Sequence, residues 1–169
     1  MSVLAVRVLE DSIEIASDSL VTYGMRVQSE IEDCKLFKIS DNFIIGGVGY
    51  LRDLSLMKMF ATDSKPSDNS YKSIFLYVSD YISYIKKHYD EYSPEDSIYY
   101  VIYDGKCYRI DGGYDIQEVT DIDSIGSGYE SANAILLYGG NVVDAVKIAC
   151  QVNPYCGGDI FKYEVKRKI

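Results

Sequence analysis

Histidine is almost missing from this sequence, which contains only His88, in the charged stretch 84–90. A Ser-His-Asp triad would have to be built around this residue, and no Gly-x-Ser-x-Gly motif lies near it. A metal site that relies on imidazole is equally hard to assemble, because the cysteines lack Cys-x-x-Cys spacing. We therefore interpret His88 as exposed at the end of a helix, and we expect no metal and no other cofactor.

Positive charge is also scarce: 17 Lys and Arg residues are outnumbered by 26 Asp and Glu residues, which gives a net charge of −9. This balance opposes binding to the phosphates of nucleic acid. No apolar run approaches the roughly 18 residues of a membrane span, and no basic, apolar leader is present. We expect a cytoplasmic protein that binds neither nucleic acid nor membranes. Its irregularly spaced cysteines are expected to be reduced and mostly buried: Cys34, Cys107, Cys150 and Cys156.

The pattern of apolar residues predicts one domain, 1–169, because no repeat, low-complexity tract or linker interrupts it. Runs of β-branched and aromatic residues between turn signals predict strands at 3–8, 12–16, 34–39, 43–48, 97–103, 106–110, 117–125 and 160–165. Apolar residues spaced by three or four predict helices at 50–61, 71–89, 130–138 and 142–152.

This order of elements indicates an α+β fold, a four-layer α-β-β-α sandwich with two mainly antiparallel sheets. We expect the first four strands to share one sheet and the strand at 97–103 to begin the second. The residues expected to be largely buried are Val6, Val8, Ile13, Ile15, Phe37, Ile44, Val101 and Ile160. The 17 tyrosines, several of them in 71–92, are typical of interfaces between proteins.

The second residue offers a chemistry that needs no histidine. Removal of Met1 would make Ser2 the first residue, with a hydroxyl and a free α-amine on the same residue. An α-amine has a pKa of about 7.7–8.0, so it can act as a base near neutral pH. Ser2 is therefore a candidate N-terminal nucleophile.

Five motifs carry a resemblance to a known family when they are taken in order. They are Ile15-Ala16-Ser17-Asp18-Ser19, Lys35 before an apolar strand, Val48-Gly49 with Asp53 beyond, Ile125-Gly126-Ser127-Gly128 before an Ala-rich helix, and Asn153-Pro154-Tyr155-Cys156-Gly157-Gly158. In this order the chain resembles the proteasome β subunits and the smaller bacterial peptidase that forms rings with an unfoldase. The resemblance spans nearly the whole chain and implies the N-terminal-nucleophile hydrolase fold.

The same resemblance implies a function and a set of partners. It implies a peptidase subunit that hydrolyses peptide bonds inside a ring of its own copies, with six or seven chains as the repeating number. A peptide would be the substrate, and an unfoldase ATPase would be a further partner.

The resemblance also assigns roles to residues. Ser2 would be the nucleophile, and Lys35 beside it would polarise the hydroxyl or move protons, with Asp18 beside Lys35. The Gly49 N–H would face the oxyanion of the tetrahedral intermediate. Ser127 would hold the terminal amine.

Two positions depart from the family pattern. Asn153 stands where the family has an acidic residue that helps to hold the amine, and Cys156 stands where it has a serine. The site would therefore carry one negative charge less, and catalysis is expected to be weaker or absent.

Four alternatives stay open at this point. In a second alignment Met1 falls at the nucleophile position, which leaves the site without a nucleophile, and a retained Met1 would block the amine of Ser2. The motifs also have purely structural interpretations, with Lys35 as a solvated charge and Ser127 as a helix cap. The competing function is a catalytically inactive, proteasome-like structural or assembly subunit.

Overall fold

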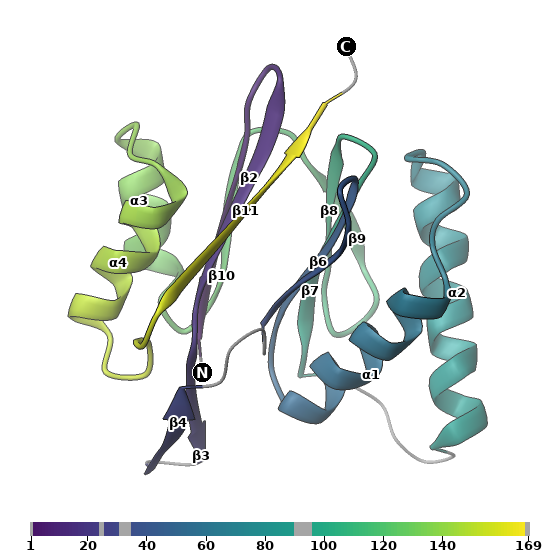
Figure 1. Cartoon of the computed structure of the whole chain (residues 1–169), viewed down its shortest axis with the longest axis horizontal. Coiled ribbons are helices and arrows are strands. Elements are labelled where there is room, and N and C mark those ends of the chain that lie inside the picture. Colours follow the sequence, from purple (N-terminus) through teal and green to yellow (C-terminus); the bar gives the residue numbers. More distant parts are fainter. Residues whose placement is uncertain (1, 24–25, 31–34, 90–95, 168–169) are drawn as a thin grey trace.

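The architecture is that of four layers, with two sheets face to face in the middle and a pair of helices outside each sheet (Figure 1). It is seen in a computed structural model that describes residues 2–23, 26–30, 35–89 and 96–167. The α+β sandwich with antiparallel sheets that the sequence predicts is confirmed. No helix in the described part of the chain is long and apolar enough to cross a membrane.

The first sheet has the strand order β10-β1-β2-β11, with all neighbours antiparallel. Its strands are β1 (Val3–Val8), β2 (Ser12–Asp18), β10 (Ile122–Gly126) and β11 (Ile160–Lys166). Leu4 pairs with Ser17 in the hairpin of β1 and β2, and Val3 pairs with Gly126 at the other side of β1. These pairings bring the N-terminus next to the end of β10.

The second sheet has the order β5-β6-β7-β8-β9, again with antiparallel neighbours. Its strands are β5 (Leu36–Ser40), β6 (Phe43–Val48), β7 (Ile98–Tyr103), β8 (Lys106–Ile110) and β9 (Ile116–Val119). A separate hairpin is formed by β3 (Leu20–Tyr23) and β4 (Arg26–Glu30).

The helices are α1 (Leu51–Asp63), α2 (Tyr71–His88), α3 (Tyr129–Leu137) and α4 (Val142–Val152). Two of the helices have polar N-cap residues. Ser70 accepts from the Ser73 N–H at the start of α2, and Asn141 accepts from the Asp144 N–H at the start of α4. Helices α1 and α2 cover the second sheet, and α3 and α4 cover the first (Figure 1). His88, the last residue of α2, is exposed, as the sequence predicts.

Both faces of each sheet are buried, which explains the apolar residues on both sides of the strands. In β1, Leu4 and Val6 pack against the second sheet, whereas Val3 and Ala5 pack against α3 and α4. Alternate side chains of one strand therefore belong to different cores. Of the residues expected in the core, six are buried and two, Val8 and Ile160, are only half-buried.

The expected division of strands between the sheets is wrong. The strands at 3–8 and 12–16 do not share a sheet with those at 36–40 and 43–48, because β6 pairs with β7 instead. The expected single strand at 117–125 is two strands, β9 and β10, which belong to opposite sheets. Residue periodicity defines which face of a strand is buried, but it does not identify the neighbouring strand. The hairpin of β3 and β4 was not predicted, and Cys34 lies outside the described residues.

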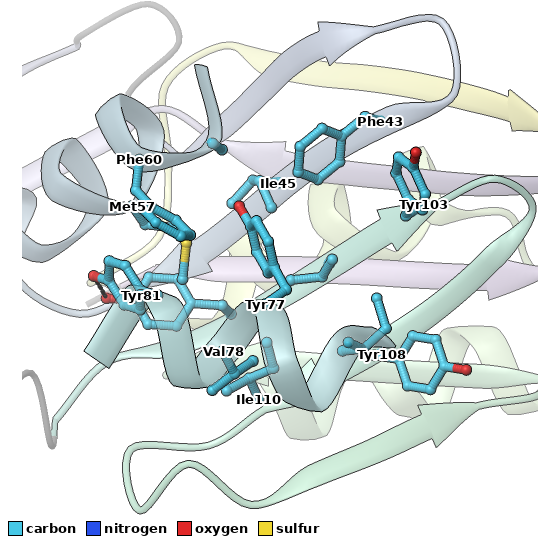
Figure 2. Close-up of a cluster of buried hydrophobic side chains, with 14 of the residues drawn as sticks. Phe43, Ile45, Met57, Phe60, Tyr77, Val78, Tyr81, Tyr103, Tyr108 and Ile110 are labelled. Atoms are coloured by element: carbon cyan, nitrogen blue, oxygen red, sulfur yellow. Dashed lines mark hydrogen bonds between the residues drawn. The ribbon is translucent and has the colours of Figure 1, made fainter. Parts of the chain in front are cut away.

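The tyrosines of α2 and the second sheet lie mainly in the core and not at an exposed interface. Figure 2 shows Tyr77 and Tyr81 of α2 pointing toward Phe60 of α1 and toward the sheet. The ring of Tyr77 meets Phe43 edge to face, with centroids 6.0 Å apart, and lies 5.0 Å from Phe60. Such contacts add to the free energy gained from burial. The interpretation of these tyrosines as interface residues is therefore wrong for the buried ones.

Two tyrosines of this core provide a matched test of stability. The Tyr77 hydroxyl is buried without a partner among the described residues, whereas the Tyr108 hydroxyl donates to the Asn69 carbonyl over 2.9 Å. We expect Tyr77→Phe to raise the free energy of unfolding by about 1 kcal/mol, because it removes an unsatisfied polar group, and Tyr108→Phe to lower it by about 1 kcal/mol. Equilibrium unfolding in urea measures both, and a destabilised Tyr77→Phe protein would contradict this packing.

Candidate active site

The centre of the candidate site is a buried ion pair between Lys35 and Asp18. The Lys35 ammonium lies 2.6 Å from Asp18 Oδ1 and 2.7 Å from the Leu20 carbonyl oxygen. Lys35 is 3% exposed and Asp18 is fully buried. Two charges can be held away from water only when they are paired and hydrogen-bonded. The interpretation of Lys35 as a solvated charge is therefore wrong.

Backbone groups complete the shell of the Asp18 carboxylate. The Val3 N–H donates to Oδ1 over 3.0 Å, and the Gly157 N–H donates to Oδ2 over 3.0 Å. The Gly157 carbonyl in turn accepts from the N–H groups of Ser19 and Leu20. Asp18 thus fixes the N-terminal strand and the loop before β11 to the end of β2.

Ser2 lies directly against Ser127, 125 positions further along the chain. The Ser2 N–H donates to Ser127 Oγ over 3.2 Å, and the Ser2 carbonyl accepts from the Gly128 N–H over 3.3 Å. Gly126 has φ +94°, and a Cβ there would lie 2.3 Å from the Ser2 carbonyl oxygen. Only glycine therefore allows the chain to pass so close to Ser2.

The position of the Ser2 nitrogen can be compared with the two alignments that the sequence leaves open. The nitrogen of Ser2 meets the Ser127 hydroxyl, which is the place that the first alignment gives to the nucleophile residue. Met1 lies outside the described residues.

The two departures from the family pattern surround Ser127. Asn153, the C-cap residue of α4, donates from Nδ2 to the Ser127 carbonyl over 2.6 Å. Cys156 Sγ lies 3.6 Å from Ser127 Oγ. Burial raises the pKa of the Cys156 thiol, which favours its protonated form. Asn153 holds the backbone of Ser127 without adding a charge.

Two cavities meet at Ser2 and Gly49. One has a volume of about 250 Å³ and mainly apolar walls, and it also reaches Lys35. The other has a volume of about 540 Å³ and is also lined by Ile125, Gly126 and Ser127. Ser2 and Gly49 therefore line both cavities. Residues that line the smaller cavity are Ser2, Leu20, Val21, Thr22, Lys35, Gly49, Tyr50, Leu51, Arg52 and Leu54.

The structure brings the site residues predicted from the sequence into one region. Ser2, Lys35 and Gly49 share the smaller cavity, and Asp18 bonds to Lys35. Ser127 bonds to Ser2 and contacts both Asn153 and Cys156. The sequence reasoning missed the Gly157 N–H and the Leu20 carbonyl, because backbone groups leave no signal in residue type.

Comparison with known proteins identifies the fold. No protein-family model and no curated protein matches the sequence. The solved structure of Thiobacillus denitrificans BPH is similar, with a TM-score of 0.83 at 16% identity over 98% of both chains. The structure of the same protein in complex with epoxomicin has a TM-score of 0.84 at 16% identity, over 99% of this chain and 100% of the other.

A third similar structure is that of HslV from Trypanosoma brucei. Its TM-score is 0.70 at 22% identity, over 99% of this chain and 100% of the other. The resemblance to proteasome β subunits is therefore confirmed at the level of the fold.

The buried ion pair predicts unequal effects of removing its two partners. Asp18→Ala leaves the Lys35 ammonium buried without its counter-charge, so we expect a loss of about 3–5 kcal/mol in the free energy of unfolding. Lys35→Met leaves the Asp18 carboxylate without its counter-charge but still bonded to the Val3 and Gly157 N–H groups, so its loss should be smaller. The double variant should recover part of the loss seen in Asp18→Ala. Urea unfolding of all three measures the coupling, and strictly additive losses would contradict the pairing.

Proposed function

We propose that this chain is a proteasome-like peptidase subunit that uses Ser2 as an N-terminal nucleophile when Ser2 is the first residue. The observation that carries the proposal is the position of Ser2. Its nitrogen lies 3.2 Å from Ser127 Oγ, and it shares a cavity with Lys35 and Gly49. A hydroxyl, an amine, a buried lysine and a backbone donor are the groups that acyl transfer needs.

In the proposed reaction the α-amine of Ser2 takes the proton of its own hydroxyl, and Oγ attacks the substrate carbonyl. Lys35 supports this proton movement, and the Asp18 carboxylate holds the Lys35 ammonium in place. The Gly49 N–H stabilises the oxyanion, which would contribute about 3–4 kcal/mol. The amine then passes the proton to the leaving nitrogen as the C–N bond breaks, and water hydrolyses the resulting Ser2 ester.

The cavities suggest how a substrate lies. The mainly apolar cavity of about 250 Å³ would take a substrate side chain, and the larger cavity would take the chain on the other side of the scissile bond. Ser127 and Asn153 would orient the amine through the contact at Ser2.

A second candidate is a catalytically inactive structural or assembly subunit with the same fold. The observation that favours it is Asn153, whose neutral amide bonds to the Ser127 backbone at the position where the family has an acidic residue. With no carboxylate there, an ammonium at Ser2 loses one source of stabilisation.

Reaction with a peptide epoxyketone distinguishes the two candidates. We expect protein that begins at Ser2 to gain the mass of one inhibitor per chain, because this warhead reacts with both the hydroxyl and the amine. Ser2→Ala should gain none and should not hydrolyse a fluorogenic peptide. Ser12→Ala is the matched control, since Ser12 is also buried but lies at the far end of β2. If the unaltered protein forms no adduct and hydrolyses no peptide, the inactive subunit is the better account.

Ring assembly is part of the proposal and is supported by exposed apolar side chains on the outer helices. Met59 of α1 is 61% exposed, and Phe75 and Leu76 of α2 are 55% and 51% exposed. Association of copies would remove such side chains from water. We expect light scattering to give a mass that is a multiple of six or seven chains, and Phe75→Glu to lower it. A monodisperse monomer at micromolar concentration would contradict ring assembly.

A further inference from the structure

A second buried polar pair lies beside the candidate site, behind Gly49. Ser97 Oγ donates to Asp53 Oδ2 over 2.5 Å, and both residues are fully buried. Asp53 belongs to the first turn of α1, where its N–H bonds to the Tyr50 carbonyl. The pair therefore joins the start of α1 to the residue that precedes β7.

Gly49 packs directly onto this pair. Its φ is +133°, and a Cβ at this position would lie 2.1 Å from Ser97 Oγ and 2.8 Å from Ser97 Cα. The strands β6 and β7 end their pairing at Val48 and Ile98, one residue away on each side. The backbone of Gly49 thus rests against Ser97, and the Asp53 carboxylate holds the hydroxyl of Ser97.

The Asp53 carboxyl has few other hydrogen-bond donors near it if the bond from Ser97 is lost. Asp53 Oδ1 is buried without a partner among the described residues, so the bond from Ser97 is the principal side-chain bond of this carboxyl. Burial raises the pKa of the Asp53 carboxyl, and the Ser97 hydroxyl and the nearby Arg52 lower it in part. Loss of the Ser97 hydroxyl would leave a buried carboxyl that must find another donor, which requires movement of the loop between β6 and α1.

We propose that Asp53 and Ser97 are positioning residues that hold the Gly49 peptide in the orientation needed to face the oxyanion formed at Ser2. This proposal rests on the proposed function. Neither side chain is placed to touch the substrate; both act through the backbone of Gly49. Displacement of an oxyanion donor by about 1 Å can lower the rate about 100-fold.

The test compares Ser97→Ala with Ser73→Ala, because each removes one buried, hydrogen-bonded hydroxyl. Ser73 bonds to Ser67 and Asp68 at the start of α2, outside both cavities of the site. With a fluorogenic peptide, we expect Ser97→Ala to lower kcat about 10- to 100-fold with KM within about twofold. Ser73→Ala should keep both constants.

Two further measurements separate positioning from general loss of structure. Asp53→Asn keeps a carbonyl that can accept from Ser97, so its kcat should fall less than that of Asp53→Ala. Hydrogen exchange should become faster in residues 48–53 of Ser97→Ala and should not change there in Ser73→Ala.

Different results would overturn the positioning role and the proposed function. Wild-type kcat in Ser97→Ala, or an equal loss in Ser73→Ala, would overturn the positioning role. If the unaltered protein shows no turnover and no adduct, the proposed function fails. The exchange data then still decide whether the pair holds Gly49, and unchanged exchange in Ser97→Ala would overturn that role as well.

Discussion

The buried ion pair of Lys35 and Asp18 is the interaction on which the rest of the site depends. Lys35 precedes β5 of the second sheet and Asp18 ends β2 of the first, so the pair joins the two sheets at one end of the sandwich. The same carboxylate also accepts from Val3 and Gly157. A buried pair is expensive to desolvate and is a poor source of stability unless it is well bonded.

The N-terminal strand takes its position from this pair and from the end of β10. Val3 is fixed by Asp18, and Ser2 is fixed by Ser127 and by the close passage of Gly126. Ser2 and the first residue of β1, Val3, are therefore held by two different parts of the chain. The Ser2 nitrogen donates to Ser127 Oγ as a peptide N–H. A terminal amine at the same place could donate to the same oxygen. The neutral Asn153 makes this half of the site less polar than a carboxylate would.

Sequence patterns predicted the long elements well, because burial on one or both faces produces a clear period: β1, β6 and α4 occupy the residues expected of them. They did not predict which strands pair with one another, because tertiary contacts determine how the strands are divided between the two sheets. The positions of Lys35 and Ser127 in the site followed from the family resemblance, since neither residue has a local signal. Ser97 has none either: its importance appears only when the Gly49 backbone is seen against it.

The proposed chemistry requires the Ser2 nitrogen, which bonds to Ser127 Oγ, to be a free α-amine. The intact mass of native, untreated protein tests this most directly, with an N-terminal peptide map to identify the first residue. We expect a chain that begins at Ser2 and is lighter than the full sequence by one methionine residue. Quantitative retention of Met1 would contradict it, because the base would then be an amide and the hydroxyl an internal side chain.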